Sequence, residues 1–536
     1  MMKLKNIFEN IIIYLYPIIL SLVPAVTLYW GSGVPIRQAY LSWITIAVMI
    51  GVLVFSINSF IKDKHKVGVI ASAISITFFY FGNFLHLISS ISMKLNIIQE
   101  KSIIEYSVLI PMILFICWLI FWIFITRIII RSDSITQKCD YYLSVVSMIL
   151  LVFMASGIGM KIDFSSKNSK YLESIILNSS VLDPSADTAH AGDDDQNLPD
   201  IYYLIFDGFG GSDTLSDYYD TDILNFIQQL EKRGIYVATE SKSNYSMTIS
   251  SLPSSLNMNY WDELAKDEIK DIGWVPVIPL LHDSLVSKYL HNRGYDLVTF
   301  PSGFWPTENF RTDKKVSPLI TLNEYQENLL LYTPVPRIFP GFLYNNHRNR
   351  VNFALDSLKD IPYEERPIFV FAHIITPHPP FIFDEEGNSV HPQRPYNHFD
   401  ADDYRKLGGT TAEYQEMYSD QVNYIFSEIL EMIDEMLLAS ESQPIIIIQG
   451  DHGPGSMVSQ SLFDENNLDE RFSIMNAYYF PDHDYSSLYP SISPVNTFRV
   501  IFNKYFEEDL PLLPDMNYFS IIHHPYEFIE VTEMLK

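Results

Sequence analysis

The chain has 536 residues, a formal net charge of −28 and a mean hydropathy of +0.08, so it exceeds one compact domain and is unusually apolar for a soluble protein. Charge is unevenly distributed, because residues 1–170 hold 14 of the 36 Lys and Arg but only 7 of the 64 Asp and Glu. The strongly acidic remainder disfavours nucleic acid as a partner, since it repels phosphate backbones. Both cysteines, Cys117 and Cys139, lie in the first part, so no disulfide framework holds the acidic part.

The first part contains five apolar runs, each close to the roughly 20 residues that cross a membrane. They cover residues 10–30, 40–61, 67–91, 106–130 and 141–160. These runs lack a polar face, which disfavours the alternative of a helical bundle buried in water. The sequence therefore predicts an integral membrane protein whose residues 1–160 form an α-helical transmembrane bundle of five spans.

The basic residues predict the orientation of this bundle. Eight lie before the first span and in the second and fourth connections, against three in the other connections; the eight are Lys3, Lys5, Lys62, Lys64, Lys66, Arg127, Arg131 and Lys138, and the three are Arg37, Lys94 and Lys101. The excess places the amino terminus in the cytoplasm. Five spans then deliver everything after residue 160 to the other side, which predicts a multi-pass protein of the cell inner (plasma) membrane with an extracytoplasmic or periplasmic domain.

A polar stretch over residues 161–198 predicts a juxtamembrane helix and a flexible acidic linker. Residues 199–536 then alternate strand and helix patterns. Strands are expected at 200–206, 295–300, 367–373 and 444–449, and helices at 222–233 and within 412–438. This alternation predicts an α/β domain with a mostly parallel central sheet, in which ligands bind beyond the carboxyl ends of the strands.

Candidate metal ligands come after two of the expected strands. Asp207 lies directly after the first strand, and Asp451 and His452 lie after the last. A carboxylate in such a place is costly unless it is paired or coordinated, and an Asp-His pair suits a divalent cation. Each motif alone is also a common turn, so the prediction rests on their joint position.

A hydroxyl-rich segment, NYSMTISSLPSSLN, spans residues 244–257. It can cap the start of a helix, or it can supply a nucleophile at a helix amino terminus, where backbone N–H groups and the helix dipole stabilise an anion. The two interpretations are compatible. A bound cation would favour the alkoxide of such a hydroxyl.

The order of these motifs, with His378-Pro379-Pro380-Phe381 between them, resembles the alkaline-phosphatase/sulfatase superfamily. In particular it resembles the membrane-anchored sulfatase-like hydrolases and transferases, which include lipoteichoic acid synthases, phosphoglycerol transferases and phosphoethanolamine transferases. The resemblance implies an α/β alkaline-phosphatase/sulfatase-like catalytic domain over residues 199–536. The C/S-x-P-x-R motif of sulfatases is not present, so sulfate-ester hydrolysis is disfavoured.

The resemblance also implies roles for individual residues. Asp207, Thr248, Asp451 and His452 resemble the ligands of one divalent metal, with Thr248 as the nucleophile. Ser246, Ser250 and Ser251 are rival nucleophiles. His378 resembles the histidine that contacts the substrate phosphate or the leaving group, and His373 is expected at a strand end. Arg471 is either an anion contact for the substrate or part of an ordinary salt bridge.

The resulting hypothesis is a transferase that moves a phospho-headgroup from a membrane lipid to a glycan or lipid acceptor through a phospho-threonine. One alternative is a phosphate-ester or phosphodiester hydrolase with the same site, and a second is a non-catalytic membrane-anchored binding module. Mn²⁺, Mg²⁺ and Zn²⁺ all suit the ligand set, and a second metal is left open. The identity of the donor lipid and of the acceptor, and the oligomeric state, are not predicted.

Overall fold

The computed structural model describes residues 2–94, 109–179, 198–261, 277–308, 311–361, 367–390, 396–398, 400–440, 442–464 and 466–535. The chain divides into two compact units. Met1–Ser166 and Leu322–Leu343 make up most of the first, the membrane unit, while Lys167–Thr321, Tyr344–Pro392 and Tyr396–Lys536 form the second, the sheet unit. The predicted acidic linker falls largely on residues 180–197, which lie outside the described residues.

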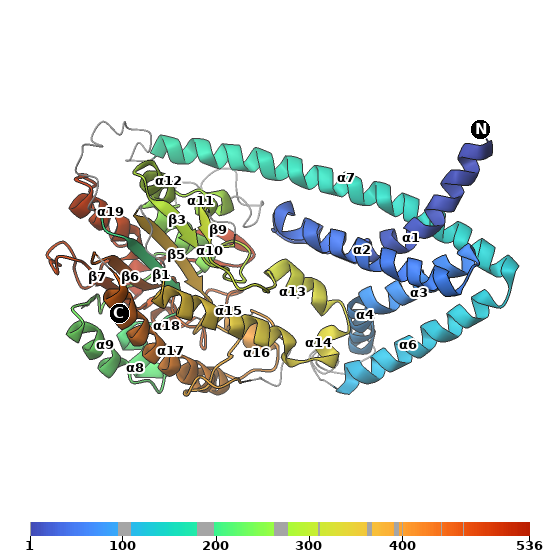
Figure 1. Ribbon diagram of the computed structural model, residues 1–536. Coiled ribbons are helices and arrows are strands. Elements are labelled where there is room, and N and C mark those ends of the chain that lie inside the picture. Colours follow the sequence, from blue (N-terminus) through green and yellow to red (C-terminus); the bar gives the residue numbers. More distant parts are fainter. Residues whose placement is uncertain are drawn as a thin grey trace. The chain divides into compact units, whose positions relative to one another are not determined.

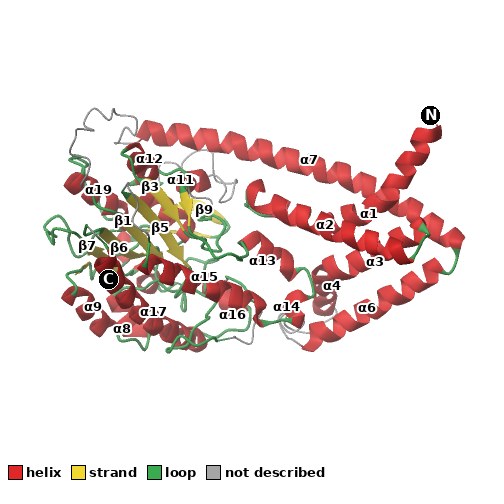
Figure 2. Cartoon of the chain, viewed as in Figure 1, coloured by secondary structure: helices red, strands yellow, loops and turns green. Residues whose placement is uncertain are grey.

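The membrane unit is built from long apolar helices (Figures 1 and 2). They are α1 (Met2–Gly31), α2 (Ile36–Phe60), α3 (Lys64–Phe79), α4 (Phe81–Lys94), α6 (Leu109–Ile130) and the part of α7 (Asp133–Ser179) up to Ser166. In the described part of the chain, four helices are long and apolar enough to cross a membrane, and the pair α3 and α4, bent by 58°, makes a fifth if it acts as one span. Large apolar side chains such as Phe55 and Phe124 are exposed, as expected where lipid rather than water covers them. The protein thus has a multi-pass membrane anchor.

Polar contacts distinguish the two ends of the membrane unit. At one end, Lys66 Nζ of α3 lies 2.9 Å from Asp133 Oδ1 of α7, so the connection between α2 and α3 lies beside the start of α7. At the other end, Lys161 of α7 donates to the carbonyl oxygen of Ser32, in the connection between α1 and α2. Its ammonium group also lies 3.8 Å from the centroid of the Tyr29 ring.

The centre of the sheet unit is a seven-stranded sheet in the order β2-β7-β6-β1-β5-β3-β4. The five strands from β6 to β4 are parallel, while β7 is antiparallel to β6 and β2 is antiparallel to β7. The strands are β1 (Ile201–Phe206), β2 (Tyr236–Val237), β3 (Asp296–Thr299), β4 (Lys314–Lys315), β5 (Ile368–Ile374), β6 (Ile445–Gly450) and β7 (Asn476–Tyr479). β1, β5 and β6 are buried on both faces, and their sequences accordingly show no alternation and are apolar except for His373 and Gln449 near the ends of β5 and β6.

Helices cover both faces of this sheet, with α9 and α17 on one side and α12 and α19 on the other (Figure 1). The side chains of α10, α12 and α19 form one core with β1, for example Leu252, Leu290 and Phe498 with Tyr203. On the other side, the rings of Phe226 and Phe426 stack at 4.2 Å. The helices of the sheet unit are α8 (Ser212–Tyr218), α9 (Ile223–Lys232), α10 (Thr248–Asn257), α11 (Ile278–His282), α12 (Leu285–Asn292), most of α15 (Gly341–Lys359), α16 (Ala401–Lys406), α17 (Thr411–Ala439), α18 (Leu468–Phe472), α19 (Pro494–Tyr505) and η4 (Thr532–Met534). The short helices α13 (Glu324–Leu331) and α14 (Val335–Ile338) lie between them in sequence but belong to the membrane unit.

The predicted fold class is confirmed: apolar helices precede an α/β unit with a mostly parallel sheet. A small hairpin of β8 (Tyr518–Ile521) and β9 (His524–Glu530) completes the sheet unit. Tyr518 stacks on Tyr245, with ring centroids 5.5 Å apart, and its backbone N–H donates to the carbonyl oxygen of Asn244. The hairpin therefore supports the segment that leads into α10.

Candidate functional site

The register of the central strands brings the predicted ligands to one edge of the sheet. In β1, Phe206 pairs with Ile374 of β5 and with Gly450 of β6, so the three strands end at the same level. Asp207 and Asp451, each one residue further on, therefore emerge side by side. The chain approaches itself so closely here that a Cβ on Gly450 would lie 2.3 Å from the carbonyl oxygen of Phe209. Only glycine fits at this position.

Three carboxylate and imidazole groups converge at this edge. Asp207, Asp451 and His452 each offer one ligand atom, and these atoms lie within 4.8 Å of one another. Thr248, the first residue of α10, joins them, since its Oγ1 lies 3.2 Å from His452 Nε2. Three segments far apart in the sequence thus present two aspartates, an imidazole and a hydroxyl to one point.

The donor set fits a divalent cation. Asp207 Oδ1 and Asp451 Oδ2 are buried, and neither accepts a hydrogen bond from any residue that the structure describes. Two carboxylate oxygens buried without donors are costly in the absence of a compensating charge. A divalent cation supplies that charge, and oxygen and nitrogen donors of this kind suit Mn²⁺, Mg²⁺ or Zn²⁺.

Hydrogen bonding fixes the tautomer of the His452 ring. Its Nδ1 lies 2.9 Å from the carbonyl oxygen of Gly453, which can only accept, so Nδ1 carries a proton and donates it. The lone pair of Nε2 then faces Thr248 and the two carboxylates. Burial and the nearby Arg471 lower the pKa of His452, which keeps the ring neutral and able to bind a metal.

The other imidazoles act on Asp207. Burial alone would raise the pKa of this carboxyl group, but neighbouring imidazoles, above all His378 and His373, hold it far below its usual range. His373, at the end of β5, has its Nε2 3.3 Å from Asp207 Oδ2, while its Nδ1 lies 3.0 Å from Thr307 Oγ1. Asp207 therefore stays ionised and points its second oxygen toward His452.

His378 lies beside this group, in the loop after β5. Its Nδ1 donates to the carbonyl oxygen of Pro379 over 2.6 Å, and its ring centroid lies 6.1 Å from that of His452. Burial lowers the pKa of His378, but Asp207 and then Asp400 outweigh this effect and raise it. A protonated His378 can donate a proton from Nε2 to a leaving group in the site.

Exposure indicates from which side a substrate arrives. Asp207, Asp451 and His452 are between 1% and 4% exposed, whereas Thr248 is 9% exposed and the His378 side chain is 12% exposed. The two groups expected to touch substrate are thus the two nearest to solvent. Of the rival nucleophiles, Ser250 and Ser251 have hydroxyls that are buried and without hydrogen bonds within the described residues, and Ser246 Oγ accepts from the backbone of Ser520.

Arg471, predicted as a substrate contact or part of a salt bridge, lies in α18 and is 2% exposed. Its Nη1 donates to Asp400 Oδ2 over 2.8 Å and to the carbonyl oxygen of Gly453 over 3.1 Å. Its Nε donates to the carbonyl oxygen of Ser246 over 2.7 Å. The guanidinium therefore joins the segment before Thr248 to the turn after His452, and a salt bridge with Asp400 is present.

Asp400 was not predicted from the sequence. It directly precedes α16, and nothing in the sequence around it, HFDADD, distinguishes it from its neighbours. Tyr414 donates to its Oδ1 over 2.7 Å. Burial acts to raise its pKa, but His378 and Arg471 outweigh this and lower it to about 2, so Asp400 is an ionised group under the site.

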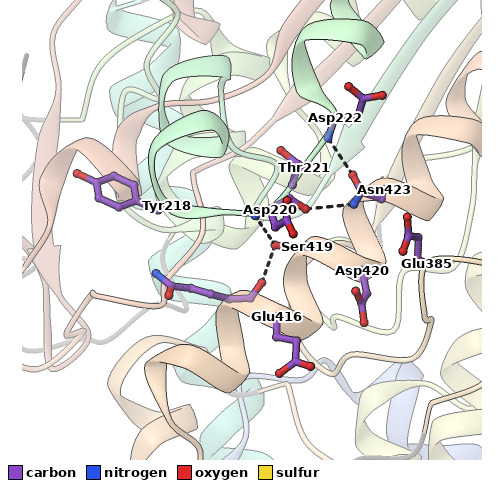
Figure 3. A pocket seen from close by; sticks show the side chains of 10 residues that line it. Tyr218, Asp220, Thr221, Asp222, Glu385, Glu416, Ser419, Asp420 and Asn423 are labelled. Carbon is purple, nitrogen blue, oxygen red and sulfur yellow. Dashed lines mark hydrogen bonds between the residues drawn. The ribbon is translucent and has the colours of Figure 1, made fainter.

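A separate hollow of about 650 Å³ lies between the end of α8 and α17 (Figure 3). Ser419 accepts from the backbone of Asp220, and the Asn423 side chain bonds the backbone of Asp220 and Asp222. Five of its ten lining residues are acidic and none is basic: Asp220, Asp222, Glu385, Glu416 and Asp420 line it with Tyr218, Thr221, Gln415, Ser419 and Asn423. Such a hollow repels phosphate, and it contains none of the predicted site residues.

No protein-family model and no curated protein sequence matches the chain. In structure it is similar to the integral membrane lipooligosaccharide phosphoethanolamine transferase A (EptA) from Neisseria meningitidis, at 12% identity and a TM-score of 0.38, over 91% of this chain and 95% of that one. The periplasmic domain of EptC from Escherichia coli in complex with Zn matches at 12% identity and a TM-score of 0.41, over 64% of this chain and 95% of that one. A phosphonate monoester hydrolase of Agrobacterium radiobacter matches at 10% identity and a TM-score of 0.36, over 60% and 80%.

Proposed function

We propose that the protein is a metal-dependent transferase that moves a phospho-headgroup, of the phosphoglycerol or phosphoethanolamine type, from a membrane lipid to a glycan or lipid acceptor. The observation that carries this proposal is the convergence of Thr248 with an imidazole and two carboxylates at one point of the sheet edge, where one oxygen of each carboxylate accepts no hydrogen bond from the described residues. Residues 1–160 would anchor the enzyme, 161–198 would tether it, and 199–536 would form the catalytic domain outside the cytoplasm.

Asp207, Asp451, His452 and the Thr248 oxygen would hold the cation. When bound, the cation would offset negative charge on the phosphoryl oxygens and lower the pKa of the Thr248 hydroxyl. The amino terminus of α10 adds backbone N–H groups at the same place, because the residue before Thr248 provides no side-chain cap. These donors can stabilise the negative charge that develops on the phosphoryl group.

The reaction is a double displacement. Thr248 Oγ1, having lost its proton to solvent, forms a bond to the phosphorus atom, and the bond from phosphorus to the lipid oxygen breaks. His378 gives its Nε2 proton to that oxygen, and the lipid leaves as an alcohol. The acceptor hydroxyl then returns a proton to His378 and displaces Thr248, which leaves the headgroup on the acceptor. With water as the acceptor, the same steps make the protein a hydrolase.

The anchor supports a lipid donor, since a domain tethered to the membrane meets lipid headgroups at high effective concentration. The acidic sequence after residue 170 disfavours an acceptor with many negative charges. A non-catalytic binding module is less consistent with the site, because it would have no use for a hydroxyl held at the metal ligands.

The test is the intact mass of the purified protein after incubation with candidate lipids and a divalent cation. A covalent intermediate would add about 123 Da for phosphoethanolamine or 154 Da for phosphoglycerol to the peptide that holds Thr248. Thr248→Ala is expected to lose the adduct and Thr248→Ser to retain it. Release of the headgroup phosphate to water without transfer would favour the hydrolase, and an adduct that persists in Thr248→Ala would place the nucleophile elsewhere.

A further inference from the structure

The membrane unit contains a segment that the sequence places in the middle of the α/β domain. Leu322–Leu343, here called the inserted segment, leaves the sheet unit after Thr321 and returns to it at Tyr344. It comprises α13, α14 and the first residues of α15. Its helices α13 and α14 have only 8 and 4 residues, and Glu324, Glu327 and Arg337 make the segment too polar to cross a membrane, so the hydropathy pattern gives no sign of its place.

Specific hydrogen bonds hold the inserted segment against the apolar helices. Tyr325 donates from its hydroxyl to the carbonyl oxygen of Ala25 in α1 over 2.7 Å, and accepts from Trp43 Nε1 of α2 over 2.8 Å. Asn323 donates to the carbonyl oxygen of Gln38 over 3.1 Å. Tyr325 is 1% exposed, so this contact is part of the packed interior of the membrane unit.

A second contact lies at the bend between α3 and α4. The backbone N–H of Gly82 donates to the carbonyl oxygen of Tyr332 over 2.8 Å. A Cβ on Gly82 would lie 2.6 Å from Tyr332 Cα, so the two backbones approach too closely for any larger residue. The inserted segment is thus fixed at two points.

These partners lie near one end of the apolar helices. Ala25 is six residues from the end of α1, and Gln38 is the third residue of α2, so at 1.5 Å per residue both lie within about 10 Å of the connection between the two helices. That connection lies at the end where Lys161 of α7 is bound. The depth corresponds to the boundary between headgroups and hydrocarbon, where Trp and Tyr are enriched.

Apolar side chains of the inserted segment face outward at this level. Ile338, Phe339 and Phe342 are 46%, 61% and 45% exposed. They lie at the end of α14 and just beyond it, and α14 packs on α6, whose outer surface near its beginning is itself apolar and exposed, with Leu109 and Ile113. The exposed apolar surface of a spanning helix is therefore continuous with that of the inserted segment.

The geometry points to a lipid-contact surface: Ile338, Phe339 and Phe342 insert into the interface of the leaflet on the side where α7 leaves the membrane. In water, three large apolar side chains clustered over five residues would be costly, whereas burial of each by acyl chains and glycerol groups is favourable. The hydrogen bonds of Tyr325 and Gly82 set the depth. This surface does not depend on the chemistry at Thr248.

Because the chain has only two cysteines, single spin labels can be placed on it for a direct test. With Cys117 and Cys139 replaced by Ser, a nitroxide is attached to a single Phe339→Cys or Phe342→Cys variant of the full chain in proteoliposomes. Collisions with oxygen, which concentrates in lipid, are compared with collisions with a water-soluble Ni²⁺ chelate. The matched references are native Cys117, exposed on the spanning helix α6, and Leu438→Cys, exposed at the end of α17.

We expect both probes to show an oxygen-to-nickel ratio several-fold above that of Leu438→Cys and closer to that of Cys117. A nickel accessibility equal to that of Leu438→Cys would mean that the surface faces water and would overturn the inference. Low collision rates with both reagents would mean that protein, such as a second copy of the chain, covers the surface, and this would overturn it as well.

Discussion

The unsatisfied carboxylates at the sheet edge make cation binding the most informative property to measure. Asp207 Oδ1 and Asp451 Oδ2 accept no hydrogen bond from the described residues, so the folded state has two buried carboxylate oxygens that a cation would bind. A ligand that binds the folded state alone, at 100 times its dissociation constant, stabilises by about 2.7 kcal/mol. For a large domain, at about 2 °C per kcal/mol, this raises the melting temperature by about 5 °C.

The assay is thermal unfolding of the full chain in detergent, with Mn²⁺, Mg²⁺ or Zn²⁺ added after removal of metals by a chelator. Asp451→Asn keeps the shape of the side chain but removes a charged ligand, and we expect the shift to shrink to that of buffer. Asp420→Asn is the matched control, because it removes one carboxylate from the acidic hollow in Figure 3 and should leave the shift intact.

Three results would refute this reasoning. The first is a shift that survives in Asp451→Asn, because the cation would then bind elsewhere. The second is a shift that disappears in Asp420→Asn, because the acidic hollow would then be the cation site. A wild-type protein that no divalent cation stabilises would also contradict it, since the site would then have to balance its carboxylates without a metal.

Three further predictions concern other parts of the chain. Asp400→Asn leaves the buried Arg471 without its counter-ion and should lower the unfolding free energy by about 3–5 kcal/mol in denaturant titrations. Asp400→Asn combined with Arg471→Met should recover most of that stability but not the activity. A double variant no more stable than the single one would contradict the pairing. Burial holds the pKa of His347 well below its usual value, so the folded state resists protonation of this ring. The unfolding free energy should therefore fall as pH drops below about 6.5, by up to about 1.4 kcal/mol per pH unit. His347→Gln should flatten this pH dependence, and an unchanged pH dependence would mean that other groups cause it. In a Cys-free background in sealed right-side-out vesicles, a membrane-impermeant maleimide should label Leu438→Cys at once but Ser134→Cys, at the start of α7, only after permeabilisation; equal labelling of the two would contradict the predicted orientation.

The strand-end part of the site could be predicted because its cause is local and repeated. A continuous apolar run such as residues 445–448 predicts a doubly buried parallel strand, and the residues just past the carboxyl ends of parallel strands lie at one edge of the sheet. Asp207, Asp451 and His452 needed only that rule to be brought together. Thr248 needed the resemblance as well, because a hydroxyl-rich segment alone is equally typical of a helix cap.

The remaining features depend on contacts between distant residues that leave no local pattern. Asp400 is placed by a tyrosine of α17 and an arginine of α18, and its loop has neither strand nor helix periodicity. The inserted segment has no long apolar run. Its place in the membrane unit comes instead from hydrogen bonds of Asn323 and Tyr325 to backbone carbonyls. Such bonds are available to any sequence with suitable side chains, so hydropathy cannot reveal them.

The contacts within the membrane unit bear on how many times the chain crosses. The start of α7 lies beside the connection between α2 and α3, and its Lys161 lies beside the connection between α1 and α2, so these connections are at opposite ends. Because α6 ends just before α7 starts, the end of α6 lies at the first end of the unit and its beginning, Leu109, lies toward the second end, whereas α3 begins at the first end. We infer that the bent pair α3 and α4 completes one crossing, which gives five. An odd number puts the amino terminus and the exit of α7 on opposite sides, and the basic residues beside the α2–α3 connection and the start of α7 favour a cytoplasmic location for that end.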